Sequence, residues 1–262
     1  MIYNINYSKC IKYGGMNSDH INIFCFWEPY DKIPAYLKLC MNTWNKIKNS
    51  KIILLNYSNL YDYIDKNTFH QNFYKLNLPK QADCIRVAIL EKYGGLWLDL
   101  DTIVINDLKD ILSDKLTFFG DDNNEIHMAF IYSKNPNNHI LKEWLDIIKN
   151  KLINFEINNS YDYVGNSIID KLIKKYPNDT NILNRHEYKI FPEGYLNNEY
   201  TFEGYVNLWF NKNNNLSSIL QNNYIIMLHN SWTPDEFKNM DKKSFLESDI
   251  LLSKFLKKIY NN

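Results

Sequence analysis

The sequence predicts an α/β fold, because short apolar runs alternate with segments that carry helical signals. The first apolar run, Ile23–Trp27, is followed by a helix that Pro34 opens as its first residue. A second apolar run, Lys51–Leu55, completes a β-α-β unit. This order of elements is typical of an open sheet with helices packed against it.

The next elements continue the alternation. A helix begins near Pro79 and continues to Tyr93, where the pair Gly94-Gly95 ends it. We expect one continuous strand over Leu96–Ile105 directly after this corner. The later part of the chain is predicted to contain strands near Ala129–Tyr132 and Tyr224–Leu228, helices near 138–151 and 167–175, and an amphipathic tail helix over Ser244–Ile259.

The composition is that of a folded protein with a sizeable core. Of the 262 residues, 45% are hydrophobic and 15% are aromatic. Lys plus Arg and Asp plus Glu each number 30, so no net charge attracts a polyanion and we expect no nucleic-acid partner. No apolar run approaches the roughly 20 residues of a membrane span. The first residues lack the apolar stretch of a secretory signal, so the expected location is the cytoplasm.

The cysteines are expected to be free thiols. They show neither a C-x-x-C motif nor a paired spacing, which argues against a metal knuckle or a disulfide framework. The expected free and mostly buried residues are Cys10, Cys25, Cys40 and Cys84.

Two acidic residues stand in the apolar run that follows the glycine pair. In a continuous strand, Trp97, Asp99 and Asp101 would share one face, since side chains alternate with period two. Burying two carboxylates costs several kcal/mol unless a cation or hydrogen-bond donors compensate them. Mg²⁺ and Mn²⁺ suit such a site, because they accept one or two carboxylates and complete their coordination with water and phosphates. The implied ligand is a nucleoside diphosphate.

A second charged pair lies on the preceding helix. Asp83 and Arg86 are three residues apart and therefore neighbours on one helical face. A surface ion pair, worth about 0.3 kcal/mol, is the simplest interpretation. However, the helix leads through Gly94-Gly95 into the paired acids, so this face could border the same crevice. There the pair could bind sugar hydroxyls and phosphate oxygens.

The stretch from Gln81 to Asp101 resembles the signature of glycosyltransferase family 32, which includes capsular-polysaccharide synthesis enzymes. The matching pattern is Ala-x-Asp-hydrophobic-x-Arg, then Lys-Tyr-Gly-Gly, then aromatic-Leu-Asp-x-Asp, in this order. The resemblance implies a GT-A type fold, a Rossmann-like mixed sheet flanked by helices. It also implies metal-dependent transfer of a hexosyl group from a UDP- or GDP-linked sugar to an acceptor hydroxyl, with retention of configuration.

The resemblance also implies roles for individual residues. Asp83 and Arg86 would hold the donor sugar, Asp99 would contact hydroxyls of the ribose or the sugar, and Asp101 would bind the metal. Asp99, Asp101 and Arg86 are therefore the catalytic candidates. Trp97 would line the donor pocket, with ordinary core packing as the alternative.

Further stretches fit the same family. His229-Asn-Ser-Trp232 resembles an element that closes over the diphosphate and completes the metal site. It makes His229 and Ser231 candidate metal ligands, and Ser231 and Trp232 candidate donor-binding residues, although a purely structural histidine stays an alternative. Trp27, at the end of the first strand, would stack on the base or lie in the core. The segment Tyr163–Asn166 stands where relatives carry Gly-Pro near the sugar.

On this interpretation residues 1–262 form a single domain, and the acceptor is a glycan, a lipid-linked glycan or a protein. The expected parts are a leader over 1–20, a nucleotide-sugar-binding core over 21–110, an acceptor side with a site-closing loop over 111–235 and a C-terminal helix over 236–262. The oligomeric state stays open.

Two other classes of protein remain as alternatives. A haloacid-dehalogenase-like phosphohydrolase also places D-x-D after an apolar strand, and its later acidic loop could be Gly120-Asp-Asp122. That loop follows too soon, and Ile103 stands where Thr or Val is expected. A non-catalytic module that binds sugar nucleotides or glycans could also use aromatic, Asp and Asn side chains.

The tail helix leaves three interpretations open. Its basic face could rest on the inner face of the membrane, where each lysine contributes about 1 kcal/mol. Its apolar face could pack in a dimer, or it could dock on the core of its own chain. The residues concerned are the apolar Phe245, Ile250, Phe255 and Ile259 and the basic Lys254, Lys257 and Lys258.

Overall fold

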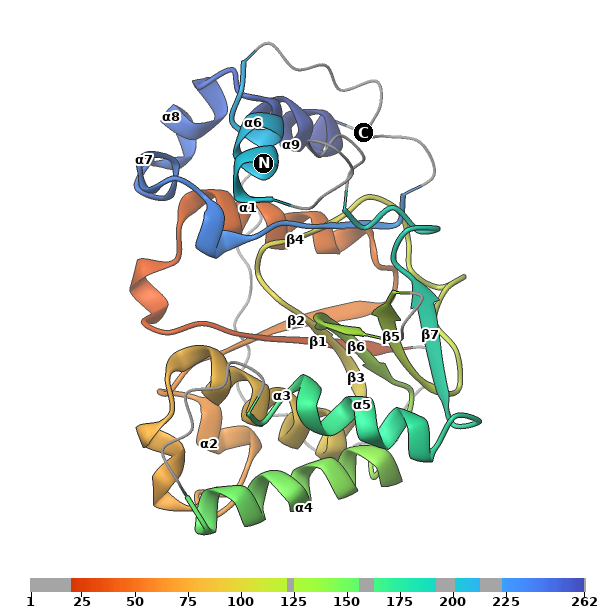
Figure 1. Ribbon diagram of the computed structural model, residues 1–262. Helices are drawn as coiled ribbons and strands as arrows, with labels where there is room; N and C mark the ends of the chain where they lie inside the picture. The colour runs from red at the N-terminus through yellow and green to blue at the C-terminus, as the bar shows by residue number, and fades with distance from the viewer. Residues whose placement is uncertain (1–19, 122–124, 156–162, 192–200, 213–222, 262) are drawn as a thin grey trace.

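The computed structural model describes residues 20–121, 125–155, 163–191, 201–212 and 223–261 (Figure 1). Its centre is a mixed sheet with helices on both faces, which confirms the predicted α/β class. The leader expected over 1–20 lies outside the described residues except for its last position, and Cys10 lies outside them too.

The main sheet has six strands in the order β2-β1-β3-β6-β5-β7. Only β6 is antiparallel to its neighbours, so the other five strands end at one common edge. A separate two-stranded sheet pairs β4 with β8. The strands are β1 (Ile21–Phe26), β2 (Ser50–Leu55), β3 (Gly95–Leu98), β4 (Thr102–Val104), β5 (Leu116–Gly120), β6 (Ile126–Ser133), β7 (Thr180–Asn184) and β8 (Ile225–Met227).

Helices cover the two faces of the main sheet unequally. In Figure 1, α2 to α5 lie on one face, and α1 lies with α6 to α9 on the other. The α-helices are α1 (Ala35–Thr43), α2 (Leu60–Tyr63), α3 (Leu78–Tyr93), α4 (His139–Ile153), α5 (Asn166–Lys175), α6 (Phe202–Trp209), α7 (Asp235–Lys238), α8 (Lys242–Glu247) and α9 (Leu251–Asn261). Short 3₁₀ turns are η1 (Tyr30–Lys32), η2 (Trp44–Lys46), η3 (Gln71–Lys75) and η6 (Asn230–Trp232).

The sheet therefore separates two hydrophobic cores. Pleating sends Ile23 and Cys25 of β1 into one core and Phe24 and Phe26 into the other. Because both faces of the sheet are covered, β5 is buried at all five residues and β1 at its last four, so these strands do not alternate between buried and exposed residues. The cysteines that the structure describes are buried and free, as expected: Cys25, Cys40 and Cys84.

The corner between α3 and β3 explains the glycine pair. Asn77 caps the first turn of α3 through its side-chain oxygen, and Gly94 ends the helix with a φ of 63°. Gly95 has a φ of 94°, and a Cβ there would lie 2.5 Å from the carbonyl oxygen of Asn22. The predicted helix and its end are confirmed within one residue. Pro34, by contrast, is the N-cap of α1 and not its first residue.

The prediction of one strand over Leu96–Ile105 is wrong. The chain pairs as β3, turns at Asp99–Asp101, where the Thr102 N–H donates to the Asp99 carbonyl at 3.0 Å, and then pairs as β4 in the other sheet. A sheet buried on both faces offers no water to a carboxylate in a central strand. The turn instead takes both acids to the sheet edge, so the shared strand face predicted for Trp97, Asp99 and Asp101 does not exist.

The tail also differs from the single predicted helix. It forms α8 and α9, which are separated at Asp249, a residue with a φ of 61°. Phe245, Ile250, Phe255 and Ile259 are buried in the core of this chain, so docking on its own core is the correct interpretation of their apolar face. Among the described helices, none combines the length and the apolar character needed to cross a membrane.

Candidate active site

Polar side chains gather at the edge where the parallel strands end. Trp27 follows β1, Asp99 follows β3, Asp121 follows β5 and Arg185 follows β7. Ligands of open α/β sheets bind outside the carboxyl ends of the strands. The fold therefore brings the sequence-predicted acids and Trp27 to the same edge.

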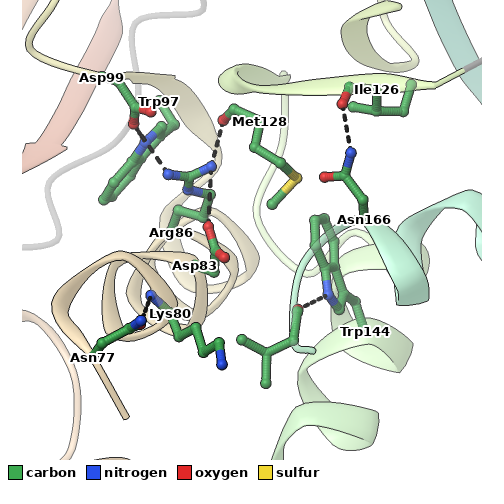
Figure 2. A network of polar contacts seen from close by, with 11 residues as sticks. Asn77, Lys80, Asp83, Arg86, Trp97, Asp99, Ile126, Met128, Trp144 and Asn166 are labelled. Carbon is green, nitrogen blue, oxygen red and sulfur yellow. Dashed lines mark hydrogen bonds and ion pairs between the residues drawn. The ribbon is translucent and has the colours of Figure 1, made fainter. Parts of the chain in front are cut away.

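Arg86 is the centre of the polar network there (Figure 2). Its Nη1 donates to the Met128 carbonyl at 2.6 Å and lies 3.3 Å from Asp83 Oδ1, and its Nη2 donates to Asp99 Oδ1 at 3.1 Å. The guanidinium also lies over the Trp97 ring, 5.2 Å from the centroid. Arg86 is only 4% exposed, so the simple interpretation of a surface ion pair is wrong.

Trp97 holds Asp99 in place. Its indole N–H donates to Asp99 Oδ1 at 2.8 Å, and the ring is 1% exposed. This burial favours the core-packing alternative over a pocket-lining role, with a polar contact added to it. The Asp99 side chain is 36% exposed, so its carboxylate is fixed on one side and accessible on the other.

Asp101 is fixed from the neighbouring sheet. The backbone N–H of Asn230 donates to Asp101 Oδ2 at 2.9 Å, and the Leu228 N–H donates to the Asp101 carbonyl at 3.0 Å. Burial, reinforced by the negative charge of Asp99, raises the pKa of Asp101 to about 7, although the Asn230 N–H opposes this shift. A nearby cation would offset both effects and stabilise the ionised form of Asp101.

The turn after β8 carries the predicted closing element. The His229 ring packs 4.6 Å from Trp232 and stacks on Phe191 at 5.6 Å. Burial lowers the pKa of His229 to about 4, so its imidazole is neutral at pH 7, the form that can ligate a metal. Ser231 is exposed at the tip of the turn. The structure thus brings His229 and Ser231 into the turn that holds Asp101, but their role as ligands stays a prediction.

Asp83 closes the other side of the network. Burial raises its pKa to about 6, the charge of Arg86 opposes the rise and Asp99 adds to it. A Cβ on Gly165 would lie 3.1 Å from Asp83 Oδ2. The backbone of the segment Tyr163–Asn166, which the family resemblance places near the sugar, therefore passes directly beside this carboxylate. The side-chain amide of Asn166 fixes this segment by donating to the Ile126 carbonyl at 2.9 Å.

A family model described as "Capsular polysaccharide synthesis protein" matches residues 4–248 of the chain. The chain belongs to this family. The sequence prediction of a capsular-synthesis type of glycosyltransferase is thereby confirmed at the level of the family. The sugar donor, the metal and the stereochemistry stay predictions.

Solved structures that are similar to this capsular polysaccharide synthesis protein are distant glycosyltransferases. One is involved in glycosylation of the major capsid of PBCV-1, with 12% identity over 84% of this chain and 98% of that chain and a TM-score of 0.49. PaToxG glycosyltransferase has 17% identity over 60% and 68%, with a TM-score of 0.41. GlyE from Streptococcus pneumoniae TIGR4 has 16% identity over 92% and 64%, with a TM-score of 0.44. No curated protein matches the chain.

The site of this family member contains residues that the sequence did not indicate. Tyr36 and Tyr205 send their hydroxyls into the turn after β8, where they meet Thr233. Arg185, which the sequence also did not indicate, pairs at 3.1 Å with Asp121, a residue of the acidic loop considered for the phosphohydrolase alternative. Each of these contacts joins distant parts of the chain, and the sequence alone carries no spacing signal for them.

The predicted base-stacking role of Trp27 and the predicted metal ligands stay predictions. Trp27 packs partly against the core, and its buried Nε1 has no hydrogen-bond partner among the residues that the structure describes. Within those residues, groups of three or more His, Cys, Asp or Glu side chains suited to a metal are absent. The predicted set of Asp101, His229 and Ser231 contains only two such side chains, so it is compatible with this finding.

The raised pKa of Asp101 predicts a pH-dependent difference in stability without metal. In the folded protein Asp101 keeps its proton up to about pH 7, so its contribution to stability is lost as the pH rises from about 4 to about 7. We expect Asp101→Asn to gain stability relative to wild type between about pH 5 and pH 8, on the order of 2 kcal/mol. Urea unfolding in EDTA measures the difference.

Two buried histidines change the stability of the protein with pH in the opposite direction, and comparing Asp101→Asn with wild type cancels their contribution. Burial lowers the pKa of His127 to about 3 and that of His229 to about 4, so both favour the folded state as the pH rises toward their unfolded value. They do so equally in wild type and variant. A difference in stability that stays constant across this pH range would contradict the prediction.

Proposed function

We propose that the protein transfers a hexosyl group from a nucleoside-diphosphate sugar to an acceptor hydroxyl, with a divalent cation bound at Asp101. One observation carries the proposal. Arg86 joins Asp83 and Asp99 into a single network at the sheet edge, next to the turn that holds Asp101. Such a cluster offers oxygens for sugar hydroxyls and for a cation at adjacent positions.

The side chains at Asp101 fit Mn²⁺ or Mg²⁺. Hard divalent cations accept one or two protein oxygens and fill the remaining positions with water and ligand phosphates. Asp101 would supply a carboxylate, and Ser231 and the neutral His229, which belong to the turn that contacts Asp101, would supply further ligands. When bound, the cation would neutralise the charge that develops on the departing diphosphate.

The remaining residues orient the donor. The accessible side of Asp99 would accept hydrogen bonds from ribose or sugar hydroxyls, and Asp83 would do the same deeper in the site. Arg86 would act by fixing both carboxylates, because its burial leaves little of it for direct contact with a ligand. Trp232 would donate its indole N–H to a phosphate oxygen, and Trp27 would stack on the base.

We further propose that the reaction retains the anomeric configuration, as the family resemblance implies. A leaving phosphate oxygen would then take the acceptor proton on the face that it leaves. The acceptor would be a glycan, a lipid-linked glycan or a protein, bound on the side of residues 111–235. The site of action would be the cytoplasm, and contact with the inner face of the membrane would have to use the exposed lysines of α9.

The two alternatives find less support. For a phosphohydrolase, Asp99 would have to attack phosphorus, yet its Oδ1 is held by both Arg86 and Trp97. In the proposed acidic loop, Asp121 is engaged by Arg185, and Asp122 lies outside the described residues. A non-catalytic module would not need the accessible carboxylate of Asp99 to lie close to Asp101 in the chain.

Calorimetry followed by a donor-hydrolysis assay tests the proposal. UDP and GDP are titrated with and without Mn²⁺, and a panel of UDP- and GDP-hexoses is then screened for release of the nucleoside diphosphate. We expect Mn²⁺-dependent binding of one nucleotide and slow release from its sugar conjugates. Cleavage of simple phosphomonoesters would favour the hydrolase, and binding of glycans without any nucleotide would favour the module.

A further inference from the structure

We propose that Tyr36 and Tyr205 are positioning residues: their hydroxyls hold the turn over residues 229–233 in the position in which it contacts Asp101. The inference rests on the proposed function, because it concerns how firmly Asp101 is presented to the cation. Both tyrosines are fully buried, and they come from α1 and α6, which are far apart in sequence. They therefore clamp the turn from two independent elements.

The turn itself is short and closely tied to Asp101. The Trp232 and Thr233 N–H groups donate to the His229 carbonyl at 2.9 and 3.1 Å, which closes η6. The Asn230 N–H points the other way and donates to Asp101 Oδ2 at 2.9 Å. Any shift of the turn therefore moves the donor that fixes this carboxylate.

Tyr205 and Thr233 form a consistent chain of hydrogen bonds around the turn. The His229 N–H donates to the Tyr205 hydroxyl at 3.3 Å, this hydroxyl lies 3.1 Å from Thr233 Oγ1, and Thr233 Oγ1 donates back to the His229 carbonyl at 3.3 Å. Each hydroxyl can thus give one proton and receive another. Thr233 is 2% exposed, so water does not replace a missing partner easily.

Tyr36 acts on the residue that contacts Asp101. Its hydroxyl donates to Asn230 Oδ1 and also lies 3.3 Å from Thr233 Oγ1. The same asparagine thus offers its backbone N–H to Asp101 and its side chain to Tyr36. Partners of this kind, which touch no ligand but orient a ligating group, commonly affect metal affinity about ten-fold or more.

Removing one hydroxyl tests the inference. In Tyr205→Phe, the His229 N–H loses a buried acceptor and the turn loses its link to α6. We expect the apparent affinity for Mn²⁺, titrated at a fixed concentration of the nucleotide that wild type binds, to fall about ten-fold. At saturating Mn²⁺, the affinity for this nucleotide should return to that of wild type.

The recovery at saturating Mn²⁺ separates positioning from a general loss of structure. The matched control is Tyr93→Phe. It removes a tyrosine hydroxyl at the C-terminal end of α3, where this hydroxyl donates to the Tyr63 carbonyl at 2.7 Å. Tyr93 packs against the hydrophobic core on the opposite face of the sheet from the turn over residues 229–233. This variant should leave the Mn²⁺ dependence unchanged. If Tyr205→Phe does not fold, Tyr36→Phe gives the same measurement.

The outcomes are distinct. An unchanged Mn²⁺ dependence in the folded tyrosine variants overturns the inference, and so does a loss of nucleotide affinity that saturating Mn²⁺ does not restore. If wild type binds neither UDP nor GDP with Mn²⁺, the proposed function itself fails. A ten-fold shift in wild-type-like folded variants, together with a silent Tyr93→Phe, supports the inference.

Discussion

Replacing Asp101 by Asn is expected to slow donor turnover by about a thousand-fold, which corresponds to a loss of about 4 kcal/mol of transition-state stabilisation. The amide keeps an oxygen for the Asn230 N–H, which donates to Asp101 Oδ2 at 2.9 Å in the wild type. What it loses is the charge that attracts a divalent cation. Release of nucleoside diphosphate from the preferred sugar donor measures the effect.

The folded state should survive this change. Burial already holds the pKa of Asp101 near 7, which means that the neutral form is tolerated there. The thermal unfolding temperature of Asp101→Asn in EDTA at pH 8 should therefore equal or exceed that of wild type. Asp114→Asn is the matched control, because Asp114 is exposed and pairs with Lys134 at the surface. Near-native turnover in Asp101→Asn would remove Asp101 from the proposed mechanism.

The local parts of the site were predictable from the sequence. The helix that carries Asp83 and Arg86 has its cap, its stop and its facing positions within one short stretch of chain, so neighbouring residues determine it. The corner at Gly94-Gly95 is equally local, because the positive φ angles there demand glycine. The pairing of Asp83 with Arg86 follows from helix geometry alone.

Contacts between distant segments were not predictable. The sequence pattern over Leu96–Ile105 fits a strand, but the pairing partners change from β6 to β8 within it, and this change decides where the chain turns. Strands β5 and β7 escaped prediction, although the five residues of β5 are all buried. Strand β5 pairs antiparallel with β6 and parallel with β7, and this pairing is a property of the sheet and not of either segment.

The same distinction applies to the electrostatics. Arg86 meets Asp99 and the Met128 carbonyl only because β3 and β6 are adjacent in the sheet. The sequence therefore suggested an ion pair on one helix face, whereas in the structure the buried Arg86 pairs with two carboxylates, those of Asp83 and Asp99. Burial also determines the direction of the shifts at Asp83 and Asp101, and burial is not visible in spacing.

Replacing Arg86 by Met should destabilise the protein by about 3 kcal/mol, because it removes the positive charge that pairs with Asp83 and Asp99 and the hydrogen-bond donor to Asp99 and the Met128 carbonyl. The lower end of the range for buried pairs applies, since the Asp99 side chain is 36% exposed. Urea unfolding at pH 8 in EDTA measures the loss in the free energy of unfolding. Lys175→Met is the matched control: it breaks a surface pair with Glu143 at 2.8 Å and should cost far less stability than Arg86→Met.

The pH dependence of this loss identifies its cause. Without Arg86, the pKa of Asp83, already raised to about 6 by burial, rises further, since Arg86 is the charge that opposes the shift. Protonation then makes the buried carboxyl neutral and removes most of the penalty. Arg86→Met should therefore lose markedly less stability at about pH 5 than at pH 8. Equal losses at the two pH values would mean that Arg86 stabilises the fold by packing, and not by holding the carboxylates that the proposed transfer uses.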